Sequence, residues 1–169
     1  MTPSKVERAK ERLMVRLADL PRHQRALDAA VELFQPDFDR EPFLEAFSSE
    51  DPAELVKANQ VQAAFENTHN HLVGLAEGIV ELKGWSPDRL DAPTVLRKLK
   101  ENGVITEAQR SALTGAQVVR SGVQHDYAEA NGDDLREAVI AVQAHSSAYV
   151  EAVVAFLIDE GVMRRKEER

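Results

Sequence analysis

Two long stretches of the chain repeat apolar or small residues every three or four positions. They cover residues 61–82 and 135–156. The repeating positions are Val61, Phe65, Thr68, Leu72, Leu75, Ile79 and Leu82 in the first stretch, and Leu135, Val139, Val142, Ser146, Tyr149, Val153 and Phe156 in the second. Residues with this spacing lie along one face of an α-helix. The pattern therefore predicts two long amphipathic helices, each with one continuous face to bury.

Shorter helical patterns precede the first long helix. Residues 6–20 and 23–34 predict two helices hinged at Pro21, because proline lacks the amide donor that a helix interior needs. The segment that follows, residues 36–47, contains two prolines and three phenylalanines. The helical patterns leave this segment unassigned.

Start and stop signals mark helices between and before the long ones. Residues 93–100 predict a short helix closed by Asn102 and Gly103, and Thr106 is placed to cap the next helix. Asp134 and Glu137 have the spacing of a capping box for the last long helix. No stretch shows the alternation of a half-buried strand. We therefore predict an all-α, up-down helical bundle over residues 51–160, with an N-terminal helical extension at 1–50 and a charged C-terminal tail at 161–169.

The composition narrows the class of protein. The chain has 169 residues and no cysteine, which excludes disulfides, thiolate nucleophiles and sulfur-based zinc sites. Its first residues, MTPSKVERAKER, are charged, and no apolar run reaches the length that spans a bilayer. We expect a soluble cytoplasmic protein that does not bind a membrane.

The charge distribution bears on nucleic-acid binding. A net charge of -8 argues at first against a polyanionic partner. However, residues 1–25 carry seven Lys or Arg against three acids, and residues 93–120 carry five against two. Residues 26–66 carry two against ten, which favours a basic protein partner as an alternative. Solvated helix faces would explain the same charges equally well.

Metal chemistry finds little support in the sequence. His69 and His71 are two residues apart on a predicted helix and point to roughly opposite sides, so they cannot bind one ion together. Asp133 and Asp134 fit the start of a helix better than a catalytic carboxylate pair. We therefore expect no metal and no other cofactor.

The stretch RSGVQHDY, residues 120–127, holds residue types that can break a phosphodiester without a metal. Arg120 can grip a phosphate with two parallel hydrogen bonds, and His125 can move a proton near neutral pH. Arg16 and His23 form a looser pair of the same kind, but Tyr127 completes a more specific R-x4-H-x-Y motif with Arg120 and His125. The structural alternative is a helix end with three ordinary surface residues.

Residues from about 55 to 158 resemble the HEPN superfamily, in particular the HepT-like toxins of HEPN-MNT toxin–antitoxin modules. The similar parts are the segment FENTHNHLVGLAEGIVELKG, the segment VLRKLKENGVITEAQRSAL leading into RSGVQHDY, and the final amphipathic helix. The resemblance implies an up-down helical bundle, a homodimer whose two motifs face a shared cleft, and metal-independent ribonuclease activity on RNA. It also implies an MNT-type nucleotidyltransferase antitoxin that attaches AMP to Tyr127.

The resemblance and the motif together suggest a mechanism and its residues. His125 would take the proton of an RNA 2′-hydroxyl while Arg120 holds the phosphate. Ser121 and Tyr127 would support the site, and the residues expected to bind the RNA backbone are Lys98, Lys100 and Arg110. The family most often has asparagine where this chain has Ser121, and a small or apolar residue where it has Gln124. The alternative function is therefore a catalytically silent HEPN-type helical domain that binds nucleic acid, a nucleotide or a protein partner.

Overall fold

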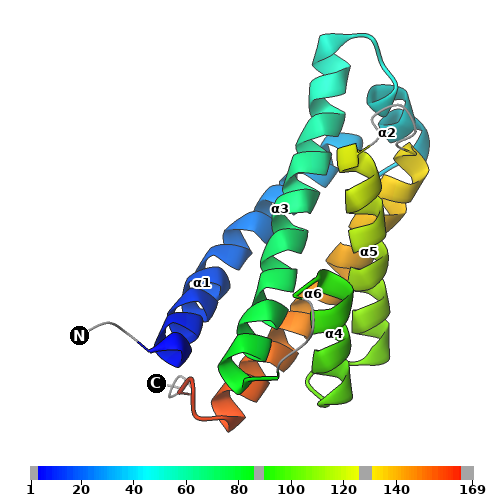
Figure 1. Ribbon diagram of the computed structural model, residues 1–169. Coiled ribbons are helices and arrows are strands. Elements are labelled where there is room, and N and C mark those ends of the chain that lie inside the picture. Colours follow the sequence, from blue (N-terminus) through cyan, green and yellow to red (C-terminus); the bar gives the residue numbers. More distant parts are fainter. Residues whose placement is uncertain (1–3, 86–89, 126–130, 165–169) are drawn as a thin grey trace.

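The computed structural model describes residues 4–85, 90–125 and 131–164, with the side chains of all of these except residues 123–125. Every regular element in these ranges is a helix. The elements are α1 (Lys5–Val31), the short 3-10 helix η1 (Glu32–Phe34), α2 (Arg40–Phe47), α3 (Pro52–Lys83), α4 (Ala92–Glu101), α5 (Glu107–His125) and α6 (Gly132–Asp159). They pack against one another as a bundle (Figure 1), which confirms the predicted all-α fold.

α3 forms the centre of the bundle. It contacts α1, α2, α4, α5 and α6, and Figure 1 shows α1 along one side of it and α5 along the other. Between Thr68 and Val80 nearly every residue of α3 is buried. A helix that is buried on almost all sides lies in the interior of a fold. The long helices predicted over residues 61–82 and 135–156 are confirmed as parts of α3 and α6.

α1 is one continuous helix of 27 residues, so the predicted hinge at Pro21 is wrong. Its first turn is closed by a capping box between Ser4 and Glu7. Leu20 and Leu27, on either side of Pro21, are both buried in the core. Burial of this apolar stripe against α3 outweighs the one backbone hydrogen bond that the proline removes, so the helix continues through Pro21.

Glycines on α3 let α1 approach closely. A Cβ atom added at Gly78 would lie 2.6 Å from Cδ2 of Leu13, and one added at Gly74 would lie 2.3 Å from Cζ of Arg16. Leu13 belongs to the same hydrophobic core as the buried residues of α3, α4, α5 and α6. The predicted N-terminal extension therefore shares one core, through α1, with the bundle predicted over residues 51–160.

The ends of α4 and α5 follow the sequence signals. α4 ends at Glu101, and Gly103 just beyond it has a φ of 72°, a conformation that glycine adopts without strain. The Thr106 hydroxyl accepts the N–H of Gln109 at 3.2 Å, and the Gln109 side chain accepts the N–H of Thr106 at 2.9 Å. This reciprocal pair caps α5, as predicted for Thr106.

α6 begins differently from the prediction. Its N-cap is Asn131, whose side chain accepts the N–H of Asp133 at 2.9 Å. The capping box predicted at Asp134 and Glu137 is therefore wrong, because the helix already begins at Gly132. Asparagine is as good an N-cap as aspartate, so α6 begins after Asn131, the earlier of the two capping residues in the chain.

The segment rich in proline and phenylalanine, residues 36–47, contains α2, and η1 lies just before it. Phe34, Phe38 and Phe43 pack together, with ring centroids 4.9 to 6.1 Å apart. Arg40 binds Asp133 of α6 through two hydrogen bonds of 2.7 Å. The aromatic packing and the contact between Arg40 and Asp133 hold the segment, and the second of these joins residues far apart in the chain.

α6 is long and apolar enough to cross a membrane, judged by length and composition alone. Its most apolar 18-residue window has a mean hydropathy of 1.3, and 28% of that window is buried. One such helix is weak evidence for a membrane span, because core helices of soluble proteins can be equally apolar. Much of α6 nevertheless remains uncovered within one chain.

Candidate functional site

The end of α5 carries the first part of the R-x4-H-x-Y motif. Arg120 and Ser121 are described in full, and α5 ends at His125. The side chain of His125 and the whole of Tyr127 lie outside the described residues. Five residues correspond to about 140° of rotation around an α-helix, so Arg120 and His125 do not lie on one line along α5.

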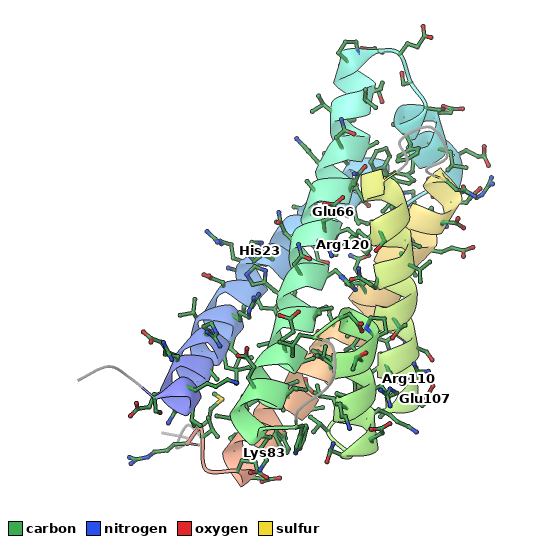
Figure 2. The ribbon with its side chains drawn as sticks, viewed as in Figure 1. His23, Glu66, Lys83, Glu107, Arg110 and Arg120 are labelled. Carbon is green, nitrogen blue, oxygen red and sulfur yellow. The ribbon has the colours of Figure 1, made fainter. Side chains whose placement is uncertain are left out.

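The Arg120 side chain enters the seam between α3 and α5. Figure 2 shows Arg120 and Glu66 at nearly the same level of the bundle, on α5 and α3 respectively. The Nε atom of Arg120 is buried and has no hydrogen-bond partner in the part of the chain that the structure describes. Within the described ranges its guanidinium also lacks a carboxylate at ion-pair distance. Among the residues that the structure describes, Arg120 is therefore held in the seam by burial and not by a carboxylate.

His69 of α3 lies fully buried in the same seam. Its Nε2 atom is 3.0 Å from the carbonyl oxygen of Leu113 on α5, so Nε2–H donates to that oxygen. Nδ1 is then an acceptor, and it has no partner among the described residues. Burial lowers the pKa of His69, and the nearby charge of Arg120 lowers it further, against the opposing effect of the Leu113 carbonyl. The imidazole is therefore neutral at pH 7.

Other polar groups of α5 line the seam. The side-chain amide of Gln117 donates to the Ser121 hydroxyl at 3.0 Å, so Ser121 is held by a residue one turn earlier. The Thr114 hydroxyl is buried without a partner among the described residues. His69, Thr114 and Arg120 thus each bury a polar atom without a partner among the described residues, and Thr68, Gln109 and Ser146 are further buried polar residues of the bundle.

Stability is expected to decrease as the pH falls below about 6.5, the ordinary pKa of histidine, because of His69. Its lowered pKa means that the folded chain binds fewer protons there than the unfolded chain. The stabilising contribution is thus fully present above that pH and is lost as the pH falls toward the lowered value. Urea unfolding at about pH 7.5 and about pH 5.5 brackets this range and measures the loss.

Variants separate His69 from other titrating groups. The pKa of His23 is also lowered by burial and acts in the same direction, whereas the raised pKa of the half-buried Glu77 acts in the opposite one. His69→Phe should therefore flatten the pH dependence without abolishing it. His145→Phe changes a half-buried histidine on α6 and serves as the control. Equal pH slopes in wild type and His69→Phe would contradict the assignment.

The basic residues predicted to bind RNA lie at the opposite end of α5 from Arg120. Lys98 lies 3.6 Å from Glu101, and Lys100 lies 4.0 Å from Glu107. Arg110 donates from Nε to Glu107 at 3.0 Å, and Figure 2 shows both near the turn between α4 and α5. Ten residues of helix separate Arg110 from Arg120, about 15 Å. The structure does not bring these residues to the motif, and their contact with RNA stays a prediction.

His69 and His71 point to different helices, as their spacing predicted. His69 contacts α5, whereas the ring of His71 packs against that of His23 of α1, with centroids 4.1 Å apart and ring planes tilted by 37°. The described parts of the chain contain no group of three or more His, Asp or Glu side chains arranged to hold a metal ion. Comparison with known proteins found no matching family model, no similar curated protein and no similar solved structure.

Proposed function

We propose that the protein is a metal-independent endoribonuclease of the HepT-like toxin type. In this proposal His125 accepts the proton of a 2′-hydroxyl, and the freed 2′-oxygen attacks the adjacent phosphorus. Arg120 stabilises the negative charge that grows on the phosphate oxygens. The 5′-oxygen then leaves and takes up a proton from the histidine, so the products are a 2′,3′-cyclic phosphate and a free 5′-hydroxyl.

The state of Arg120 carries the proposal. Other arginines of the chain, such as Arg40, Arg97 and Arg110, bind carboxylates. Arg120 has no such partner among the described residues, although its Nε atom is buried in the seam. A fixed guanidinium without a carboxylate can bind a phosphate through its remaining donors.

The proposal includes a homodimer formed through α5 and α6. Val118 is 69% exposed and Ile140 is 41% exposed. Between these helices lies a groove of about 330 Å³ with small apolar residues along it and Ser111, Asp134 and Glu137 also lining it; the apolar residues are Ala112, Gly115, Ala116, Val119, Ala138 and Ala141. A second copy would cover this groove and the uncovered part of α6, and would bring a second motif to the first.

Charged substitutions on this face are expected to dissociate the dimer. The double variant Val118→Asp and Ile140→Asp places two carboxylates where the second copy would bury apolar surface. Light scattering after size exclusion should give a dimer for wild type and a monomer for the variant. Val56→Asp is the control, because Val56 is 52% exposed near the start of α3 and away from the groove. A monomeric wild type would contradict the dimer.

In this proposal the ribonuclease activity is regulated by modification of Tyr127. An MNT-type nucleotidyltransferase antitoxin would attach AMP to its hydroxyl and so place a bulky anion beside the phosphate-binding arginine. Tyr127 follows Arg120 by seven residues, which correspond to about two turns of an α-helix. We place both proteins in the cytoplasm.

The direct test is cleavage of single-stranded RNA by the purified protein in EDTA. One expected product ends in a 2′,3′-cyclic phosphate and therefore resists ligation or labelling reactions that need a 3′-hydroxyl. The other begins with a 5′-hydroxyl and therefore resists ligation that needs a 5′-phosphate. Cleavage that requires added metal, or that leaves a 5′-phosphate, would overturn the mechanism. RNA binding without cleavage would favour the alternative of a catalytically silent HEPN-type domain.

A further inference from the structure

Two buried polar atoms on the two sides of the α3–α5 seam are chemically complementary. On α3, Nδ1 of His69 is an acceptor, because the Nε2–H of the same ring donates to the Leu113 carbonyl oxygen. On α5, the Nε–H of Arg120 is a donor. Neither atom has a hydrogen-bond partner in the described ranges of the chain. Buried polar atoms of native proteins are rarely left without a partner, so both are expected to be hydrogen-bonded in solution.

The geometry of α5 directs Arg120 toward His69. Leu113 and Arg120 are seven residues apart, which is about two helical turns, so they lie on the same face of α5. At Leu113 this face contacts His69. Side chains of a helix point toward its N-terminus, so the Arg120 side chain extends back in the direction of Leu113. Figure 2 shows Arg120 at nearly the level of Glu66, which precedes His69 on α3 by about one turn.

Electrostatic interaction places the same two groups near each other. Burial lowers the pKa of His69, and the positive charge of Arg120 lowers it further, against the opposing effect of the Leu113 carbonyl. A neutral ring keeps the lone pair of Nδ1, whereas a protonated ring has donors only. The lowered pKa of His69 therefore preserves the acceptor atom on the side of the seam that holds Arg120.

The guanidinium of Arg120 has one buried nitrogen and two that are left for a ligand. Among its three nitrogens, only Nε is a buried atom without a partner in the described part of the chain. The side chain as a whole is only partly buried. A hydrogen bond at Nε would fix the plane of the guanidinium. The terminal groups at Nη1 and Nη2 would keep the donors with which arginine binds phosphate oxygens.

We propose that His69 is a positioning residue for Arg120, and that one buried water molecule joins Nδ1 of His69 to Nε of Arg120. The water donates to Nδ1 and accepts from Nε–H, as buried waters do between polar groups that lack a direct partner. His69 is itself fixed by its hydrogen bond to Leu113. The inference rests on the proposed ribonuclease function for what Arg120 binds, but the position of Arg120 is measurable without RNA.

Two substitutions of His69 separate the roles of its two ring nitrogens. The short amide of His69→Asn reaches about as far as Nδ1, so it keeps a polar group toward Arg120 but loses the contact with Leu113. The longer amide of His69→Gln reaches about as far as Nε2, so it keeps the Leu113 contact but loses the group at Nδ1. His71→Gln is the matched control, because His71 lies on the same helix and packs against His23 of α1.

The first readout is the NMR signal of the Arg120 Nε–H group in the full chain without RNA. Arg120→Lys removes this signal and so assigns it. His69→Gln should speed the exchange of this proton with solvent about tenfold, the effect of losing one hydrogen bond to a charged group. His69→Asn and His71→Gln should leave the exchange rate within about twofold of wild type, because both keep the group at Nδ1.

The second readout is the rate of RNA cleavage at saturating RNA in EDTA. His69→Gln should lower this rate about tenfold, because the phosphate-binding group is no longer held in position. His69→Asn should restore it to within about threefold of wild type. If the exchange of Nε–H responds as expected but wild type does not cleave RNA, the ribonuclease function fails and the positioning of Arg120 by His69 stands.

Equal Nε–H exchange in wild type and His69→Gln would overturn the inference. Equal acceleration in His69→Gln and His69→Asn would also overturn it, because the Leu113 contact or packing alone would then hold Arg120. An equal acceleration in His71→Gln would have the same consequence. If neither His69 variant folds, the nitrogen resonance of His69 Nδ1 decides: Arg120→Lys should shift it, and an unchanged resonance would rule out the bridge.

Discussion

Replacing Arg120 by lysine is expected to slow RNA cleavage by about 10²–10³-fold, the usual cost of losing a group that stabilises transition-state charge. Lysine keeps the positive charge but offers one ammonium in place of a planar guanidinium, so it cannot bind two phosphate oxygens at once. The Nε atom of Arg120 is also buried in the α3–α5 seam, which fixes the guanidinium in a way that a flexible lysine cannot copy. The rate of cleavage in EDTA at saturating RNA measures the effect.

Arg97→Lys is the matched control for this substitution. Arg97 is exposed on α4 and binds Glu101 at 3.1 Å, so the same chemical change there should alter the rate by less than about twofold. Urea unfolding of Arg120→Lys should show that the bundle remains folded under the assay conditions. A rate equal to that of wild type, or an equal loss in Arg97→Lys, would remove Arg120 from the site.

The spacing of apolar residues identifies the long helices, but it predicts fewer buried residues on α3 than the structure shows. The stepped positions from Val61 to Leu82 predict one buried stripe, whereas Val73, Gly74 and Gly78, outside that stripe, are buried too. Glycine has no side chain to signal a core position. Its burial follows from the close approach of α1, which depends on residues more than fifty positions away in the chain.

Local rules fail where distant contacts decide the structure. Pro21 predicts a break because a proline removes a helical hydrogen bond, but the core contacts of Leu20 and Leu27 hold α1 straight through it. In the same way, α2 depends on aromatic packing around Phe43 and on the contact between Arg40 and Asp133. The contact between Arg40 and Asp133, which lie 93 positions apart, cannot be predicted from a short window of sequence.

The candidate site was predictable only in part. Arg120 could be identified as a candidate residue because it belongs to the R-x4-H-x-Y motif. Its role in catalysis stays a prediction, as do the roles of His125 and Tyr127. His69 was considered only as a metal ligand and so was missed as a partner of the seam. It lies four residues after Phe65 and three before Leu72, a spacing that predicts a buried face. Charge counts likewise could not show that Lys98, Lys100 and Arg110 lie beside carboxylates.

Gly78→Ala is expected to destabilise the fold by about 1–3 kcal/mol, because it places a methyl group in a space already filled. The new Cβ would lie 2.6 Å from both Cγ and Cδ2 of Leu13, so α1 must shift or the leucine must leave its rotamer. Gly122→Ala is the matched control. A Cβ there meets nothing within 4 Å, so the better helix propensity of alanine should stabilise α5 by up to about 1 kcal/mol.

The stability effects of substitutions at Leu13 and Gly78 should also be coupled, and a double-mutant cycle measures this coupling. Leu13→Ala alone should cost about 2–5 kcal/mol, since it leaves a cavity where a fully buried leucine packs against α3. In the Gly78→Ala background the new methyl group occupies part of that cavity, so the double variant should lose less stability than the sum of the single losses. Additive losses would mean that Leu13 and Gly78 do not form the contact through which α1 packs onto α3. That outcome would place the packing of α1 onto the bundle at its other buried residues, such as Leu20 and Leu27.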